Sequence, residues 1–135
     1  MQAVFLRIKL EHLDEQNQYR KRIANRYLDG LRDIPGLGLP VVPENVNPVW
    51  HLFVVTYHDR NRLQGYLDEQ GVNTLVHYPI PPHLSGAYKD LGYGVGDFPI
   101  TEWLAERVLS LPMGPHLTLD DVDYIIENIR AFCNL

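Results

Sequence analysis

Apolar residues in the first thirty positions recur mostly at intervals of three, four or seven, which is the period of an amphipathic helix. No proline interrupts the pattern before Pro35, so we predict one long helix over residues 2–31, broken near Asn17. The positions that carry this pattern are Phe5, Leu6, Leu10, Leu13, Ile23, Tyr27, Leu28 and Leu31. Residues 3–6 are apolar all round, which a helix tolerates only when it is buried on every side. We expect this start to pack on material outside the chain.

Prolines and glycines between residues 35 and 48 predict turns that lead to a strand over residues 49–57. Its centre, LFVV, is continuous rather than alternating, so both faces of the strand are expected to be covered. Asp59 is placed to cap a helix over residues 60–70, and Gly71 marks its end. A second strand is expected directly afterwards, at residues 72–77.

The rest of the chain alternates short loops with short elements. Residues 78–82, YPIPP, lack backbone donors at three positions and predict a stiff surface loop. After it we expect a short helix at 85–90, a glycine-rich turn at 92–96, a helix at 101–108, a strand at 109–112 and a last helix. Thr118 and Asp121 open that last helix in the manner of a capping box. The order predicts an α/β fold in which helices cover one face of a small sheet, behind a long leading helix.

Composition limits the class of protein. The chain has 135 residues, enough for one globular domain without disulfides, and 45% of them are hydrophobic. The formal charge of −5 argues against a nucleic-acid partner. Cys133 is the single cysteine, as expected of a cytoplasmic protein. No apolar run is long enough to cross a membrane, and Arg7 and Lys9 interrupt what would be the apolar core of a signal peptide.

The segment HYPIPPH at residues 77–83 is the strongest candidate for a site, because proline holds two imidazoles and a phenol on a stiff backbone. Two interpretations have about equal weight: a binding loop formed by His77, Tyr78 and His83, or a loop that packs on a neighbour. A metal site is disfavoured, since the two histidines match no standard zinc spacing and lack a third ligand.

Other clusters have simpler explanations. The cations Arg20, Lys21, Arg22 and Arg26 resemble a phosphate patch, but acidic residues share their helix and a solvated face is the simpler interpretation. The glycines at 92–96 follow no strand and precede no Lys-Ser or Lys-Thr pair, which disfavours a phosphate loop. Cys133 is expected to be a packing residue.

Four blocks in order resemble one known family. They are residues 1–10 (MQAVFLRIKL), 50–55 (WHLFVV), 71–79 (GVNTLVHYP) and 109–113 (LSLPM). Together they are similar to the small C-terminal domain of DegT/DnrJ/StrS-type aminotransferases, which use pyridoxal phosphate (PLP) on nucleotide-linked keto sugars and share the fold of the aspartate aminotransferase group. The resemblance spans residues 1–135. The loop at 77–83 looks most like that of members acting on a 3-keto-6-deoxy sugar linked to dTDP.

The resemblance implies a homodimer with glutamate as amino donor, and it places His77, Tyr78 and His83 at the mouth of the cofactor cleft as substrate-binding residues. Family members are much longer than this chain, and the large domain that holds the PLP lysine has no counterpart in it. Lys9, Lys21 and Lys89 do not resemble that site, so no catalytic residue is assigned and this chain alone is not expected to hold PLP or to be active. A non-catalytic binding remnant or a dimerisation module remains the alternative.

Overall fold

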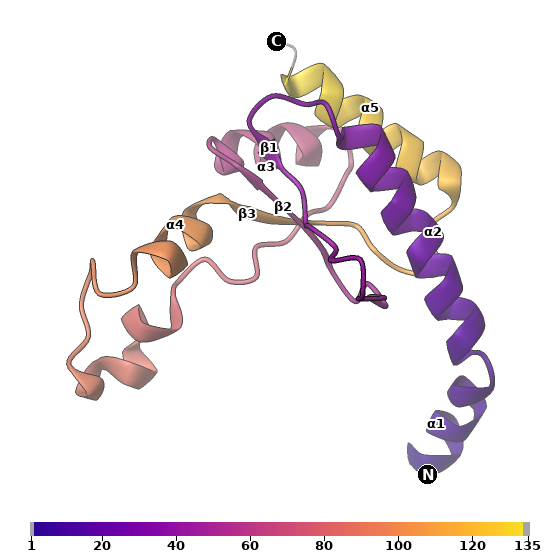
Figure 1. Cartoon of the computed structure of the whole chain (residues 1–135), viewed down its shortest axis with the longest axis horizontal. Helices are drawn as coiled ribbons and strands as arrows, with labels where there is room; N and C mark the ends of the chain where they lie inside the picture. Colours follow the sequence, from indigo (N-terminus) through magenta and orange to yellow (C-terminus); the bar gives the residue numbers. More distant parts are fainter. Residues whose placement is uncertain (1, 134–135) are drawn as a thin grey trace.

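The computed structural model describes residues 2–133; Met1 and residues 134–135 of the predicted domain lie outside the described part. Figure 1 shows a central sheet with helices on one side and an arm that extends away from it. In chain order the elements are α1 (Gln2–Glu11), α2 (Leu13–Leu31), β1 (Leu37–Gly38), β2 (Phe53–Tyr57), α3 (Arg60–Glu69), the 3₁₀ helices η1 (Pro82–Leu84) and η2 (Gly86–Leu91), α4 (Pro99–Arg107), β3 (Val108–Leu111) and α5 (Leu119–Cys133). The predicted α/β class is confirmed.

The sheet is antiparallel, with strand order β1-β2-β3. Leu37 pairs with Tyr57 at one end of β2, and Phe53 pairs with Leu111 at the other. Burial alternates along β2, because Phe53, Val55 and Tyr57 are buried while the two residues between them are half-buried. The expectation that both faces are covered is therefore only partly confirmed.

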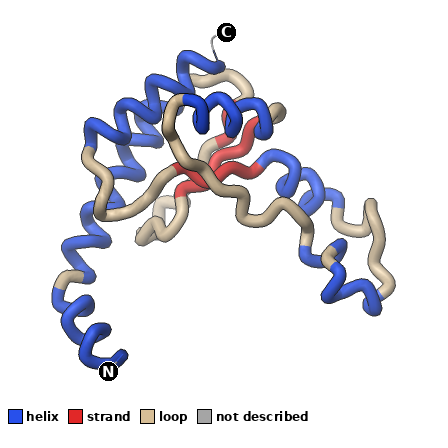
Figure 2. The backbone as a smooth tube through the Cα atoms, turned by 180° about the vertical axis from the view of Figure 1, so that it is seen from behind, coloured by secondary structure: helices blue, strands red, loops and turns tan. Residues whose placement is uncertain are grey.

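The core lies where α2 and α5 pack side by side over the sheet (Figures 1 and 2). Tyr27 is fully buried, stacks at 4.9 Å on Phe53 and donates its hydroxyl to the carbonyl of Pro112 at 3.0 Å. Burial also raises the pKa of the Tyr27 phenol. The start of α5 is a capping box, in which Thr118 and Asp121 exchange hydrogen bonds, as the sequence predicted. The contacts of Tyr27 hold α2 on the sheet, and the capping box sets where α5 begins.

The leading helix is broken at His12, not near Asn17, so that prediction is wrong in position. Asp14 and Glu15 occupy the first turn of α2, where the helix dipole favours negative charge, and this helps a new helix begin there. The apolar side chains of α1 are exposed: Phe5 by 61% and Leu6 by 66%. No residue of α1 is buried against the described part of the chain.

The second predicted strand is largely wrong. Residues 72–77 form only one bridge, between Leu75 and Ser110 of β3. The ladder cannot extend further because the chain turns away at residues 76–78, and the prolines that follow lack donors. The strand predicted at 49–57 begins only at Phe53, after an irregular stretch in which Trp50 has a positive φ of 56°. Among the described helices, none is long and apolar enough to cross a membrane.

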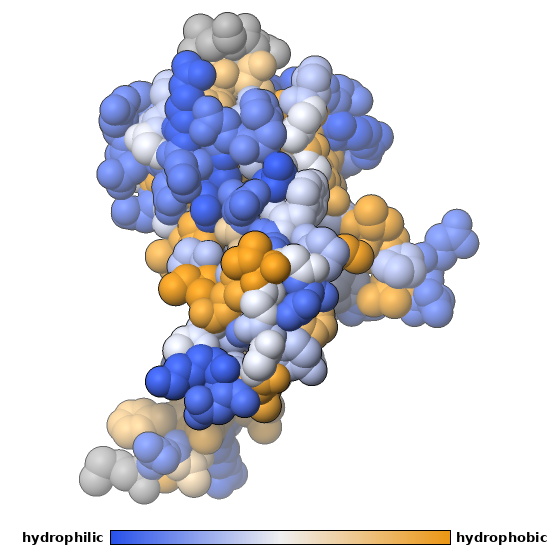
Figure 3. Space-filling model, turned by 90° about the vertical axis from the view of Figure 1, so that its left-hand side faces the viewer, coloured by the Kyte–Doolittle hydropathy of each residue, from blue (hydrophilic) through white to orange (hydrophobic). Residues whose placement is uncertain are grey.

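An arm formed by residues 78–107 projects from the sheet in both ribbon views (Figures 1 and 2). It contains η1, η2 and α4, and it returns to the sheet through β3. The expected helices at 85–90 and 101–108 are present as η2 and α4, with shifted ends. Figure 3 shows apolar side chains gathered on the side of the molecule from which the arm extends. Ile100 and Val95 are among the exposed apolar residues of the arm.

Candidate functional site

The candidate loop, residues 77–83, begins beside the sheet. His77 is half-buried, and its Nδ1 lies 2.9 Å from the hydroxyl oxygen of Ser110. Ser110 is only 4% exposed and is held in β3 by the bridge to Leu75. The hydroxyl of Ser110 therefore fixes one ring nitrogen of His77, and within residues 2–133 the other ring nitrogen makes no hydrogen bond.

Tyr78 is the most exposed aromatic residue of the loop, at 72%. Its ring meets that of His77 edge to face, with centroids 5.7 Å apart, and the peptide bond between the two residues is cis. A shallow cavity of about 220 Å³ lies between this loop and α4, with walls formed by residues such as Pro81, Leu104 and Val108. His77 and Tyr78 also line it. The structure thus brings these two predicted residues together at one cavity.

His83 is placed differently. It is 9% exposed, its ring lies 4.8 Å from that of Phe98, and its Nε2 is 3.0 Å from Oε1 of Glu102. His83 does not line the cavity that His77 and Tyr78 share. The polar contact of His83 with Glu102 lies inside the arm. The predicted role of His83 in binding the substrate therefore stays a prediction.

The carboxylate of Glu102 accepts several hydrogen bonds. Its carboxylate accepts hydrogen bonds from the backbone N–H of Gly96 at 2.9 and 3.0 Å and from that of Phe98 at 3.3 Å, besides the contact to His83. The bond from Gly96 is the main cause that holds the pKa of Glu102 below its ordinary value, so this group is a carboxylate at neutral pH. Burial acts in the opposite direction, and the contact to His83 lowers the pKa further.

The sequence analysis missed both Ser110 and Glu102. A signal existed for each: Ser110 is the polar residue inside an otherwise apolar strand, and Glu102 lies in the first turn of α4, where a carboxylate meets free N–H groups. Neither signal predicts which residue the side chain contacts. Their contacts with His77 and His83 appear only in the fold.

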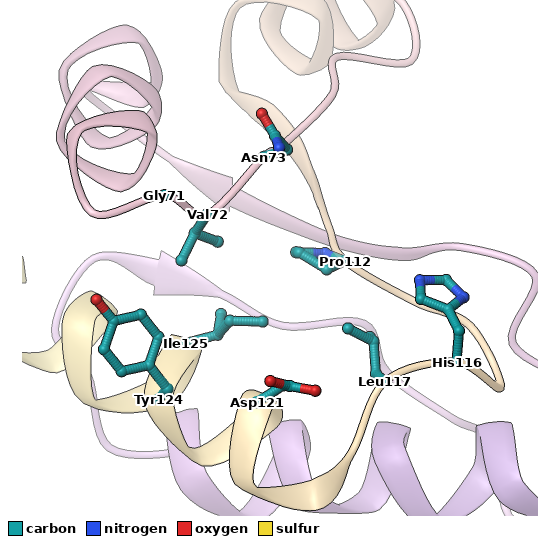
Figure 4. Close-up of a pocket in the computed structure, with 9 residues that line it drawn as sticks. All are labelled: Gly71, Val72, Asn73, Pro112, His116, Leu117, Asp121, Tyr124 and Ile125. Carbon is teal, nitrogen blue, oxygen red and sulfur yellow. The ribbon is translucent and has the colours of Figure 1, made fainter.

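A second cavity, of about 580 Å³, lies between the segment after α3, the end of β3 and the start of α5 (Figure 4). Two of its polar side chains, those of Asp121 and Tyr124, are already paired. Asp121 accepts from Thr118, which lowers the pKa of the Asp121 carboxyl, and the Tyr124 hydroxyl donates to the carbonyl of Gln70 at 3.2 Å. In Figure 4 the side chain of Leu117 lies between Asp121 and His116. The side chains of Asn73 and His116 lie apart in Figure 4, so we do not place the site in this cavity.

The other clusters serve the fold. Arg20 donates to the carbonyls of Trp50 and Met113, and Arg26 pairs with Asp123, so neither is free to hold a phosphate. In the glycine-rich turn, the amides of Gly94 and Gly96 are already bound to the carboxylates of Asp97 and Glu102. Within residues 2–133, no three His, Cys, Asp or Glu side chains are grouped as metal ligands.

Cys133 packs against the core and is half-buried. Burial raises the pKa of its thiol, whereas a reactive cysteine needs a lowered one. The prediction of a packing residue is confirmed.

The lysines of the chain do not fit PLP. A lysine that forms a Schiff base with this cofactor must lie buried beside it. Lys9 and Lys89 are exposed, on α1 and η2, and Lys21 is half-buried on α2, where it lines a hollow beside the loop at 42–48. None of the three lysines is therefore placed as a Schiff-base lysine would be, and no chemical step is derived through the cofactor.

Comparison with known proteins gives consistent matches. The sequence profile described as the DegT/DnrJ/EryC1/StrS aminotransferase family matches residues 1–130. The chain is 47% identical over 131 residues to the erythromycin biosynthesis sensory transduction protein EryC1 of Saccharopolyspora erythraea, covering 97% of this chain and 36% of that protein. It is also 47% identical over 132 residues to the dTDP-3-amino-3,4,6-trideoxy-alpha-D-glucose transaminase of Streptomyces venezuelae, covering 98% and 35%.

Among solved structures, the fold matches that of S. venezuelae DesV in complex with a ketimine intermediate, with a TM-score of 0.97 and 45% identity. The match covers 100% of this chain and 36% of DesV. The chain thus spans about a third of the length of the relatives it matches.

Proposed function

Because this chain belongs to the DegT/DnrJ/EryC1/StrS aminotransferase family, we propose that it forms the small C-terminal domain of an enzyme that transfers an amino group from glutamate to a nucleotide-linked keto sugar. The observation that carries this proposal is the match, over the full length of the chain, to DesV, whose structure includes a ketimine intermediate. The similarity of the S. venezuelae relative, whose name specifies a dTDP-linked 3-amino sugar, supports a dTDP-linked 3-keto-6-deoxy sugar as substrate.

In this proposal His77 and Tyr78 contact the nucleotide sugar. Both line the same cavity, and Tyr78 presents its phenol to solvent. A phenol and a ring nitrogen can bind hydroxyl groups or a diphosphate, as a sugar nucleotide requires. They do not exchange protons with the reacting carbon, because in this chemistry that task belongs to the cofactor lysine.

PLP is the cofactor that membership of the family implies. The lysines at positions 9, 21 and 89 do not fit it, so we assign the Schiff-base lysine to a part of the enzyme outside residues 1–135. The exposed apolar face of α1, with Phe5 and Leu6, suits a contact with that part. We further propose that the whole enzyme is a cytoplasmic homodimer.

The test is a transamination assay on the gene product that contains this chain. That protein is incubated with PLP, glutamate and a dTDP-linked 3-keto-6-deoxy sugar, and the product is identified by mass spectrometry. We expect a gain of an amino group at C3 and stoichiometric 2-oxoglutarate. A folded protein that binds PLP but converts none of a panel of nucleotide-linked keto sugars would contradict the proposal.

The competing function is a binding module that does not turn over a substrate. The observation in its favour is that the described residues hold no lysine suited to PLP. The transamination assay above distinguishes the two functions, and residues 1–135 expressed alone test whether this chain binds the cofactor itself. We expect no absorbance band of a lysine aldimine after dialysis against PLP and no reductive labelling by borohydride. A stable adduct on one of the three lysines would show that this chain binds the cofactor itself.

A further inference from the structure

The loop at 77–83 is held at its first end by the sheet. Ser110 is buried in the middle of β3, and both its backbone groups pair with Leu75, at 2.7 and 3.2 Å. Its side chain then reaches the Nδ1 of His77 at 2.9 Å. Because β3 is buried along its whole length, this attachment point belongs to the most fixed part of the fold.

The other end of the loop is held by α4. His83 donates to, or shares a proton with, Glu102, and the same carboxylate accepts the N–H groups of Gly96 and Phe98. One side chain therefore joins η1, the glycine-rich turn and the first turn of α4. A half-buried carboxylate with three different donors is a strong junction, since charge-assisted hydrogen bonds are stronger than neutral ones.

Between these two attachments the chain has little freedom. Pro79, Pro81 and Pro82 each fix a φ angle, and Pro81 has φ −55° and ψ 140°, which is extended polyproline geometry. Besides prolines, the exposed residues between the two attachments are Tyr78 and Ile80. A displacement of His83 must therefore be passed along the loop toward Tyr78, because the prolines leave few dihedral angles to absorb it.

We propose that Ser110 and Glu102 are positioning residues that hold the two ends of the loop at 77–83 and so present His77 and Tyr78 to the nucleotide sugar. In this arrangement His83 acts through Glu102 and does not touch the substrate. The inference rests on the proposed function for its ligand, but the attachment itself does not depend on it.

The chain offers matched controls for both residues. Glu106 is also a carboxylate of α4, but its side chain is 73% exposed and pairs only with Arg107 on the surface. Ser85, at the start of η2, makes no side-chain cap hydrogen bond. Glu106→Gln and Ser85→Ala therefore repeat the chemical changes without touching either attachment.

The first measurement is hydrogen exchange by mass spectrometry on the gene product that contains this chain. Glu102→Gln is expected to speed exchange of the amides of Gly96 and Phe98 by about tenfold or more, the effect of losing a charged acceptor. Peptides containing His77 and Tyr78 should also exchange faster in Glu102→Gln and in Ser110→Ala. Peptides from β2 and α5 should not change. Wild-type exchange throughout residues 77–98 in both variants would overturn the attachment.

The second measurement separates positioning from mere stability. With a dTDP-linked keto sugar, Glu102→Gln and Ser110→Ala should raise KM about five- to tenfold while kcat is nearly kept, since a misplaced loop weakens binding alone. Glu102→Asp, which keeps the charge, should recover part of the loss. A lower Tm with unchanged KM would show that the residues serve only folding and would overturn the inference.

The inference can still be tested if Glu102→Gln does not fold or if the wild-type protein is inactive. If Glu102→Gln does not fold, His83→Gln and Glu102→Asp remove or lengthen the same contact, and the exchange of Gly96 decides in its place. If the wild-type protein shows no transamination, the proposed function fails, and affinity for thymidine diphosphate then replaces KM as the readout. Equal affinity in wild type and both variants overturns the inference.

Discussion

Arg26 and Asp123 form a two-pronged ion pair that joins α2 to α5: Nε lies 2.6 Å from Oδ1, and Nη2 lies 2.7 Å from Oδ2. The hydrogen bonds from Arg26 hold the pKa of Asp123 below its ordinary value. A carboxyl whose pKa is lowered by folding stabilises the fold at pH values above its unfolded-state pKa. That contribution is lost as the pH falls through the folded-state pKa.

We therefore expect Asp123→Asn to lower Tm at neutral pH and at low salt. The difference from wild type should shrink as the pH falls below the ordinary aspartate value of 3.8, and it should also shrink in high salt, because both side chains are partly exposed. Asp29→Asn is the matched control, since Asp29 pairs with Arg32 on one helix and both are exposed. Thermal unfolding as a function of pH measures both. A Tm difference that does not shrink as the pH falls below 3.8 would contradict the assignment.

Alanine substitutions at Gly30 and Gly65 are expected to change the stability of the fold in opposite directions. A Cβ added at Gly30 in α2 would lie 2.6 Å from Cδ1 of Ile126 in α5, whereas one added at Gly65 in α3 would meet nothing within 4 Å. Gly30→Ala should destabilise the fold by about 1–3 kcal/mol through overpacking. Gly65→Ala should stabilise it by about 0.5–1 kcal/mol, because alanine favours the helix. Denaturant unfolding measures both, and equal shifts would contradict the packing of α2 on α5.

The first helix leads to a prediction about association. Val4 and Phe5 are each 61% exposed on α1, and a soluble monomer seldom exposes a cluster of such side chains. The isolated chain is expected to self-associate through this helix. Replacement of Phe5 and Leu6 by serine should shift the sedimentation coefficient to that of a monomer. A monomeric wild-type chain at high concentration would show that α1 is not an interaction surface.

Local signals in the sequence predicted much of this fold. The last helix was predicted from Thr118 and Asp121, which form a capping box local in the chain. The strand predicted at 49–57 and the helix predicted at 60–70 also rest on local signals, although the strand begins only at Phe53 and Asp59 makes no side-chain cap hydrogen bond. The strand pairing of residues 72–77 was predicted wrongly. Only Leu75 finds a partner there, and that partner, Ser110, is distant in sequence.

The candidate site was predicted in part for a similar reason. Histidine, tyrosine and proline types at 77–83 pointed to a stiff loop with polar groups, and the structure shows the loop. The contacts that hold it, from Ser110 to His77 and from Glu102 to His83, join positions far apart in the chain. No periodicity or capping rule reports such a contact. The helix break was predicted near Asn17 and not at His12 because several positions in that helix are equally polar.

The most direct test of the account is steady-state kinetics of His77→Ala and Tyr78→Phe in the transaminase that contains this chain, with the dTDP-linked keto sugar varied and glutamate saturating. We predict that each variant raises KM for the sugar nucleotide and nearly keeps kcat, with a loss in kcat/KM equivalent to about 1–3 kcal/mol, as expected when a hydrogen-bond partner of the substrate is removed. KM for glutamate should be unchanged. Variants that are as stable as wild type and keep the wild-type KM for the sugar nucleotide would contradict the claim that this loop binds the substrate.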